Sequence, residues 1–368
     1  MTGQPITTVP VSVSGLTMVY SGRTVLNVPL LEVKSGEVMA VIGPNGSGKT
    51  TLLFNLALLT MPTTGTVFYS GMPITTGHQM LELRRRIATV FQEPLLLAMS
   101  VRENVMLGLQ FRKVEGGEAK RRARKWLERF GVVALENRSP RTLSGGEAKR
   151  VSLARAFALE PEMLFLDEPF TALDSPTRQA LLEDFESVLR ETKVTTVMVT
   201  HDRNEALAVA HRVAVLIGGK LRQVGTPEEV FNYPVDEEVA GFVEAGNILS
   251  GTVATQSEGL AVIQTSDREI EAVSTLPAGT KVTICLRHED VTLALPTAEP
   301  LTSSARNRFR GKVTRLFPVG SQVRVTLDCG FPLVALITRR SWEGMGLKEG
   351  QELIATFKAS SIHLIGHK

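Results

Sequence analysis

The sequence predicts a two-domain protein, in which an α/β domain with a parallel sheet precedes a smaller all-β domain. The chain has 368 residues, more than one hydrophobic core usually holds. As far as residue 245, apolar runs of strand length alternate with helical segments and glycine-rich turns. From residue 246 the chain is rich in Val, Thr and Gly and has only short alternating segments, which are typical of β structure.

A glycine-rich loop lies at the centre of the predicted α/β domain. Residues 38–42 are apolar and predict a buried strand, and residues 51–59 predict the helix that follows. The segment between them reads G-x-x-x-x-G-K-T, the phosphate-binding loop of nucleotide-hydrolysing enzymes. Lys49 is placed to reach the β- and γ-phosphates, and Thr50 to offer a hydroxyl group to Mg²⁺. The expected nucleotide-binding residues of the loop are Gly43, Pro44, Asn45, Gly46, Ser47, Gly48, Lys49, Thr50 and Thr51.

Composition limits the class of protein. Hydrophobic residues make up 43% and charged residues 21%, ordinary values for a globular protein in water. No apolar run reaches the roughly 20 residues of a membrane span, and residues 1–5 show no secretory signal. Only Cys285 and Cys329 are present, which is consistent with a reducing compartment. A net charge of +3 is too small to indicate a nucleic-acid partner.

Short elements surround the phosphate-binding loop. Residues 11–32 alternate and are broken at Ser21-Gly22 and at Pro29, which predicts short antiparallel strands. Tyr20 is either a half-buried strand residue or a ring on which adenine stacks, and its place near the loop favours stacking. Further along, we expect a strand at 66–69, a helix at 81–86 and a strand at 87–91. This last strand leads into Gln92 and is halted by Pro94.

A helical insertion is expected at about residues 93–160, and it contains a second glycine motif. Ser144 is a natural N-cap, and Glu147 three residues later completes a capping box. With Gly145 and Gly146 between them, this helix start is a second potential anion site in the same chain.

Acidic residues follow the next predicted strand, at 163–166. Asp167 is the expected metal-side carboxylate, acting through bound water, and Glu168 the expected base for an attacking water molecule. A further buried strand, 194–200, ends at His201. A lone histidine is more often structural, but the carboxyl end of a parallel strand is where α/β sheets bind ligands. A hairpin at 213–224 and a helix from residue 227 complete the domain.

These motifs, in this order, resemble the ATPase subunit of ABC transporters over residues 11–245. The segment from Gly43 to Thr50 is similar to the Walker A loop, Gln92 to the Q-loop and 143–147 to the signature motif. Residues 163–168 resemble Walker B, Asp174 lies in the D-loop, His201 is similar to the switch histidine and Tyr20 to the aromatic A-loop. The resemblance implies an α/β P-loop NTPase, an ABC-type ATPase with antiparallel β and helical subdomains.

The same resemblance implies a mechanism and partners. Two copies would form a homodimer around two ATP molecules, and each ATP would lie between the Walker A loop of one copy and the signature helix of the other. Ser144, Gly145, Gly146 and Glu147 would then contact the ATP bound by the partner. Glu168, His201 and Gln92 would be catalytic, and Mg²⁺ would be held by Thr50, Gln92 and Asp167. The helical insertion and Gln92 would contact two integral-membrane permease subunits, at the cytoplasmic face of a prokaryotic membrane, with an external solute-binding protein as an indirect partner.

The distal domain contains an internal repeat. Residues 247–253 recur as 307–313, and 286–293 match 357–364 in register, with 296–303 as the expected linker. Two such units predict a barrel-like pair, a C-terminal all-β domain of the TOBE or OB-like kind. The second copy resembles the molybdate-binding type of TOBE domain. Its candidate oxyanion ligands are Arg306, Lys358, Ser360 and Ser361.

Several functions are compatible with these motifs. The favoured one is the ATPase of an importer for molybdate or tungstate. Import of sulfate, phosphate, iron or a sugar remains an alternative, because permease and binding protein select the cargo. A soluble ABC-type ATPase is a further alternative, and so is a cytoplasmic oxyanion-binding protein. The β domain is either an oxyanion sensor or a structural dimerisation or regulatory domain.

Overall fold

The computed structural model describes residues 10–266, 268–296 and 303–367, and it divides into two compact units, Met1–Pro227 and Glu228–Lys368. The division falls before the domain boundary expected at residue 245, because α9 (Glu237–Phe242) lies in the second unit. The start of the chain, where no signal sequence was expected, lies outside the described residues. So does most of the linker expected at 296–303.

The first unit is built on one mixed sheet of ten strands in the order β5-β4-β1-β2-β10-β9-β3-β8-β7-β6. Strands β9, β3, β8, β7 and β6 are parallel, whereas β1, β2, β4 and β5 pair in antiparallel fashion. The strands are β1 (Val11–Tyr20), β2 (Arg23–Val33), β3 (Val38–Ile42), β4 (Thr64–Tyr69), β5 (Met72–Pro73), β6 (Ile87–Val90), β7 (Met163–Asp167), β8 (Thr195–Val199), β9 (Arg212–Ile217) and β10 (Lys220–Gly225).

Burial on both faces explains why the central strands are mainly apolar, with Asp167, Thr195 and Thr196 as their polar residues. Every residue of β3, β7 and β8 is buried. On one face the core includes Leu52 and Leu56 of α1, and on the other it includes Phe157 and Phe185. The helices of this unit are α1 (Lys49–Leu56), α2 (Gly77–Arg84), α3 (Val101–Phe111), α4 (Gly116–Arg129), α5 (Gly145–Ala158), α6 (Ser175–Thr192) and α7 (Arg203–Val209); α8 (Pro227–Asn232) spans the division.

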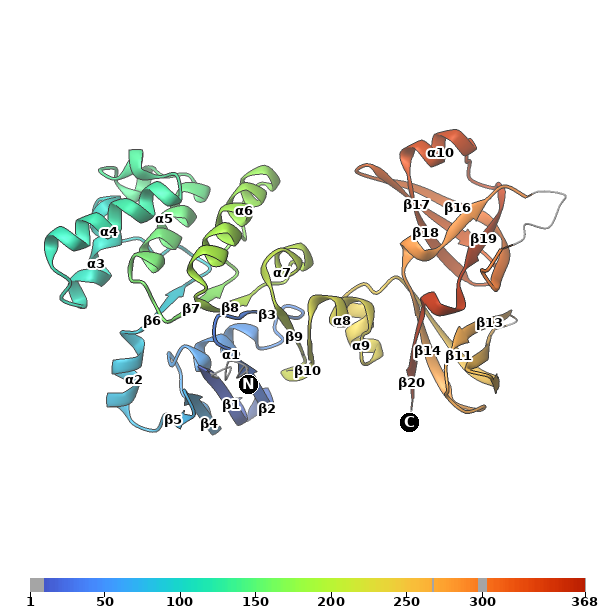
Figure 1. Ribbon diagram of the computed structural model, residues 1–368, viewed down its shortest axis with the longest axis horizontal. Coiled ribbons are helices and arrows are strands. Elements are labelled where there is room, and N and C mark those ends of the chain that lie inside the picture. The colour runs from blue at the N-terminus through green and yellow to red at the C-terminus, as the bar shows by residue number, and fades with distance from the viewer. Residues whose placement is uncertain (1–9, 267, 297–302, 368) are drawn as a thin grey trace, which may run out of the picture. The chain divides into compact units, whose positions relative to one another are not determined.

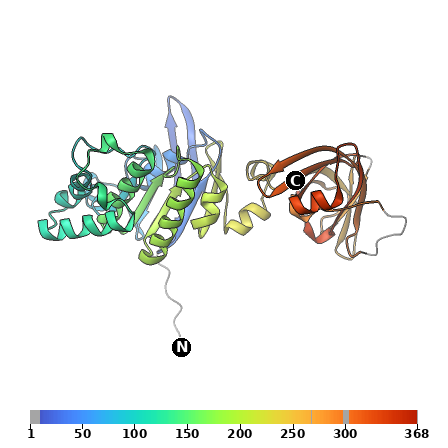
Figure 2. The ribbon, with the colours of Figure 1, turned by 90° about the horizontal axis from the view of Figure 1, so that it is seen from above.

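Helices α3, α4 and α5 form a group of their own between β6 and β7. Both ribbon views show them gathered to one side, away from the antiparallel strands β1 and β2 (Figures 1 and 2). Phe157 of α5 stacks on Trp126 of α4, with ring centroids 5.0 Å apart. An edge-to-face contact joins the group to the rest of the unit, since the ring centroids of Phe157 and Phe185 of α6 are 6.2 Å apart. The signature helix α5 is therefore packed on both sides. Within the described residues, no helix has the length and apolar character needed to cross a bilayer.

Several expected element boundaries were wrong. Helix α1 covers Lys49–Leu56 rather than 51–59. Helix α2 covers Gly77–Arg84 rather than 81–86, because Thr76 and Gln79 form a capping box that sets its start. Pro29 does not interrupt β2. Val28 and Leu30, its neighbours, both pair with β1, so the strand accommodates the proline.

The second unit contains two five-stranded antiparallel sheets, and each holds a strand from the other repeat. One sheet has the order β13-β12-β11-β14-β20 and the other β15-β19-β16-β17-β18. Strand β20, from the second copy, pairs with β14 of the first, and β15, from the first copy, pairs with β19 of the second. The strands are β11 (Asn247–Ser257), β12 (Leu260–Thr265), β13 (Arg268–Val273), β14 (Lys281–Leu286), β15 (Thr292–Ala294), β16 (Asn307–Val319), β17 (Gln322–Asp328), β18 (Pro332–Thr338), β19 (Glu352–Phe357) and β20 (Ile362–Gly366), with helix α10 (Arg339–Met345) after β18.

Two asparagines at equivalent repeat positions fasten the copies to each other. The Asn247 side chain accepts a hydrogen bond from the Val334 amide at 2.6 Å and donates to its carbonyl at 2.9 Å. The Asn307 side chain makes the same two bonds to Glu271, both at 2.8 Å. Each asparagine side chain thus forms hydrogen bonds with both the backbone N–H and the C=O group of one residue in a strand of the other copy. The two sheets also share one hydrophobic core.

Candidate active site

A cavity of about 670 Å³ opens at the carboxyl ends of the parallel strands. Strand register brings the relevant ends together, since Val41 of β3 pairs with Val199 of β8, which pairs with Asp167 of β7. The carboxyl edge of such a sheet is the usual ligand site in α/β folds. The cavity is lined by Tyr20, Val25, Asn45, Gly46, Gly48, Lys49, Thr50, Thr51, Gln92, Glu168, Thr171 and His201.

The glycine-rich loop has the backbone shape of an anion cradle. Gly48 is the N-cap of α1 and has φ 95°, and Gly46 has φ 76°, both in the left-handed region that favours glycine. A Cβ atom at Gly43 would lie 2.0 Å from the carbonyl oxygen of Leu216, so no larger residue fits there. Gly46, Gly48 and Thr50 all line the cavity, so the N-terminus of α1 faces it.

Lys49 supplies the cation of this cradle. Its Nζ atom donates to the loop's own carbonyls, at 2.9 Å to Gly43 and 3.0 Å to Pro44. Burial lowers the pKa of the Lys49 ammonium group from its ordinary value, although the nearby Glu168 and Asp167 carboxylates oppose this change. A phosphate group offers stronger acceptors than these two carbonyls, so the arrangement is suited to a nucleotide.

The donor set beside the loop fits Mg²⁺. The Thr50 hydroxyl donates to Asp167 Oδ1 at 3.0 Å, which brings together two oxygen groups of the kind that Mg²⁺ prefers. Burial raises the pKa of the Asp167 carboxyl, with a further contribution from Glu168, whereas the Thr50 hydrogen bond acts in the opposite direction. A divalent cation would relieve the buried negative charge. Gln92, the third expected ligand, also lines the cavity.

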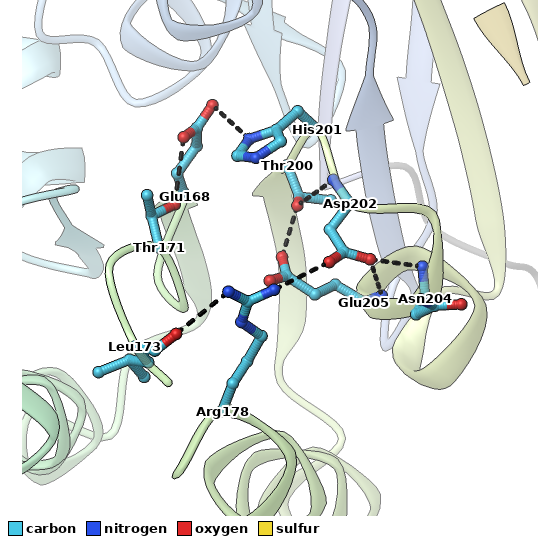
Figure 3. A network of polar contacts seen from close by, with 9 residues as sticks. All are labelled: Glu168, Thr171, Leu173, Arg178, Thr200, His201, Asp202, Asn204 and Glu205. Carbon is cyan, nitrogen blue, oxygen red and sulfur yellow. Dashed lines mark hydrogen bonds and ion pairs between the residues drawn. The ribbon is translucent and has the colours of Figure 1, made fainter. Parts of the chain in front are cut away.

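Glu168 and His201 are in direct contact. His201 Nδ1 lies 3.2 Å from Glu168 Oε1, and the Thr171 hydroxyl donates to Glu168 Oε2 at 3.2 Å (Figure 3). Glu168 has φ 43°, a left-handed conformation that is uncommon outside glycine and costs on the order of 1 kcal/mol. Its amide donates to the Val199 carbonyl at 2.9 Å, which holds the residue there. Both carboxylate oxygens are therefore fixed at the cavity wall.

The signature motif does not line the cavity of its own chain. Ser144 caps α5, accepting from the Glu147 amide at 3.3 Å, while its own amide donates to Glu147 Oε2 at 2.7 Å. The predicted capping box is confirmed. Gly145 borders open space, so the N-terminus of α5 is accessible to a ligand from outside the chain. Asp174, of the expected D-loop, caps α6 by accepting from the Thr177 amide at 3.0 Å.

Sequence reasoning missed the residues that hold these loops in place. Arg155 of α5 donates to the carbonyls of Pro94 and Leu95, at 2.7 and 2.9 Å, and Lys149 donates to the carbonyl of Gln92. The segment after β6 is therefore attached to the signature helix. Charged residues on a helix ordinarily indicate a solvated face, so the sequence offered no signal for this attachment.

Two of the candidate oxyanion residues of the second unit, Arg306 and Lys358, lie near each other, but Arg306 has an acidic neighbour. Asn307 pairs with Phe357, which places Arg306 and Lys358 next to each other at the ends of their strands. Arg306 Nη1 forms an ion pair with Glu271 Oε2 at 3.3 Å, and this carboxylate was not foreseen. Arg306, Lys358 and Ser360 are exposed and Ser361 is partly buried.

The geometry of the cavity in the first unit defines a P-loop nucleotide hydrolase. Comparisons with known proteins agree with this class. The ABC transporter family matches residues 26–171 and the TOBE domain matches residues 303–364. A molybdate/tungstate import ATP-binding protein of Pyrococcus horikoshii is 37% identical over 90% of this chain and 93% of its own. A sulfate/thiosulfate import ATP-binding protein of Thermosynechococcus vestitus is 36% identical over 88% of this chain and 89% of its own. The chain belongs to the ATP-binding proteins of the ABC transporter family.

Solved structures support the same fold. The dimeric structure of a bacterial ABC transporter cassette has a TM-score of 0.55 and 31% identity over 59% of this chain and 98% of that one. A post-hydrolysis state of such a cassette, bound to ADP and phosphate, has a TM-score of 0.55 and 32% identity over the same shares. The expected fold class and ATPase activity, with ATP and Mg²⁺, are confirmed.

Proposed function

We propose that this chain is the ATP-hydrolysing subunit of an importer, with molybdate or tungstate as the favoured cargo. The observation that carries the catalytic part is the fixed Glu168 carboxylate, held on one oxygen by His201 and on the other by Thr171. The cargo part is supported by the relatives named for molybdate and tungstate, at 37% identity over 90% of the chain.

Glu168 would act on the water molecule that attacks the γ-phosphorus atom. As the new P–O bond forms, Glu168 accepts a proton from the water, the bond to the β–γ bridging oxygen breaks, and ADP and phosphate result. His201 keeps the carboxylate in place through Nδ1, and its Nε2 atom would face the γ-phosphate. Lys49 and the α1 N-terminus bind the phosphates, and Tyr20, which is 49% exposed at the cavity rim, offers its ring to adenine. Mg²⁺, when bound by Thr50, Asp167 and Gln92, would offset the phosphate charge.

The assembly would contain two copies of this chain. In each copy the signature residues Ser144, Gly145, Gly146 and Glu147 lie outside the cavity and at an open helix N-terminus, as expected if they contact the ATP of a partner. Asp174 would lie at the same junction. We further place the dimer beneath two permease subunits at the cytoplasmic face of a prokaryotic membrane, with an external binding protein as an indirect partner and no nucleic acid.

A pair of substitutions tests the catalytic assignment. Glu168→Gln keeps the shape of the side chain but cannot accept a proton, so we expect turnover to fall about 100-fold or more. ATP affinity should be retained, and size-exclusion chromatography with ATP should show a trapped dimer. Lys49→Ala should instead lose nucleotide affinity. Normal hydrolysis by Glu168→Gln would contradict the assignment, and a variant that stays monomeric with ATP would contradict the dimer.

The cargo is tested with the assembled transporter. ATPase activity in the presence of permease and binding protein should rise with molybdate or tungstate and not with sulfate, phosphate, iron or sugars. Stimulation by sulfate alone would favour the alternative, which the sulfate/thiosulfate relatives keep open.

We also propose that Arg306, Lys358, Ser360 and Ser361 bind an oxyanion. Calorimetry on the full chain with molybdate, tungstate, sulfate and phosphate tests it, and Glu271→Gln should strengthen binding by removing a competing carboxylate. If none of the four anions gives a heat of binding, the second unit has a structural role and the oxyanion proposal is wrong.

A further inference from the structure

Arg178 of α6 joins two loops of the active site. Its Nη2 atom donates to the carbonyl of Leu173 at 3.1 Å, in the loop that follows Glu168. Its Nη1 atom lies 3.2 Å from Asp202 Oδ2, in the loop that carries His201 (Figure 3). No motif of the family resemblance includes this arginine, and it does not line the nucleotide cavity.

The loop that carries His201 is held on both sides of the histidine. Asp202 Oδ1 caps α7, accepting from the amides of Asn204 at 2.7 Å and Glu205 at 3.4 Å. The hydroxyl of Thr200 donates to the buried Glu205 carboxylate and accepts from the Asp202 amide at 3.0 Å. The position of Asp202 therefore affects the position of His201, and Arg178 connects Asp202 to α6.

The loop after Glu168 contains strained backbone conformations. Ala172 has φ 64°, and Glu168 itself has a left-handed backbone, so this loop includes two conformations that non-glycine residues rarely adopt. Such conformations persist only where surrounding contacts hold them. The Arg178 bond to the Leu173 carbonyl is one such contact, two residues from Thr171.

We propose that Arg178 is a positioning residue for ATP hydrolysis, because it ties together the two loops whose side chains hold the two oxygens of Glu168. Thr171 holds Oε2 from one loop and His201 holds Oε1 from the other. Arg178 reaches the carbonyl through Nη2 and the carboxylate through Nη1, and the single nitrogen of a lysine does not reproduce this planar fork. The inference rests on the proposed role of Glu168.

A double-mutant cycle tests the proposal on the full chain. We expect Arg178→Gln and Asp202→Asn each to lower kcat about 10- to 100-fold with an unchanged KM for ATP. The double variant should lose no more than the worse single variant, because the two groups act as one unit. Arg178→Lys should recover at most a small part of the lost kcat. Arg190→Gln is the matched control, since Arg190 lies on the same helix and pairs with Glu186 at its exposed end.

The outcomes separate this inference from the proposed function. Melting temperatures identify a purely structural role: an Arg178→Gln protein that is less stable but has wild-type kcat well below its melting temperature overturns the proposal. Additive losses in the double variant, or full rescue by lysine, also overturn it. If Glu168→Gln is inactive and Arg178→Gln is normal, only the positioning role fails. If Glu168→Gln hydrolyses ATP normally, the proposed function fails first, and the positioning role fails with it.

Discussion

At the scale of single residues, the site places charge where the fold disfavours it. Asp167 is 6% exposed at the end of a buried strand, and Glu168 next to it has a left-handed backbone. Neither feature stabilises the nucleotide-free protein. Both make sense for a site whose cation and phosphates supply the missing interactions on binding, so that part of the binding energy offsets a local instability.

Asp167→Asn should therefore raise the melting temperature of the nucleotide-free, magnesium-free protein at neutral pH while abolishing magnesium-dependent turnover. The pKa of Asp167 is raised above its ordinary value of 3.8, chiefly by burial, so the folded state binds this proton more tightly than the unfolded chain. The stability of the wild type then rises relative to the variant as the pH falls through the raised pKa. Melting curves in EDTA across acidic pH check this, and a variant that is less stable at every pH would contradict it.

At the scale of elements, two helices in the α3–α5 group begin with the same device and are expected to differ in function. The Ser100 amide donates to Glu103 Oε2 at 2.7 Å and its hydroxyl accepts from the Glu103 amide at 3.3 Å, the same lengths as for Ser144 and Glu147. A capping box alone is therefore a structural feature. What distinguishes α5 is the open space at Gly145.

Ser144→Ala and Ser100→Ala form a matched pair. Each should lower the free energy of unfolding by roughly 0.5–2 kcal/mol, the usual cost of a lost N-cap. Only Ser144→Ala should also weaken the ATP-dependent dimer of the Glu168→Gln protein, measured by analytical ultracentrifugation. Equal dimerisation by the two variants would show that the Ser144 hydroxyl only caps its helix.

At the scale of the whole molecule, local sequence patterns predicted what local physics determines. Apolar runs identified β3 and β7, and the carboxyl-end rule placed Glu168 and His201 together, which the 3.2 Å contact confirms. Long-range pairing has no such signature. The exchange of β15 and β20, the Arg178 bridge and the Glu271 carboxylate beside Arg306 depend on contacts between distant segments, which no periodicity records.

One tryptophan lies in each unit, Trp126 in the first and Trp342 in the second, so each unit can be followed separately. In a Trp126→Phe background, Ile263→Ala should lower the unfolding free energy reported by Trp342 by about 2–5 kcal/mol. Ile263 belongs to the first copy, whereas Trp342 follows β18 of the second, and the two sheets share one core. Leu327→Ala in β17 is the control. If Leu327→Ala lowers the unfolding free energy reported by Trp342 and Ile263→Ala does not, the two sheets unfold independently.

Each copy of the repeat contributes one strand, β15 or β20, to the sheet of the other copy, and this exchange has a consequence for the evolution of the unit. A half-length ancestor with one copy would expose an unpaired edge, and edges of that kind recruit strands from other molecules. Its folding would then depend on its concentration, as in any obligate association. Tandem fusion of two copies makes the missing strand part of the same polypeptide, at an effective concentration that dilution cannot change. The halves are then free to diverge in sequence, and here Lys358 in one corresponds to Arg287 in the other.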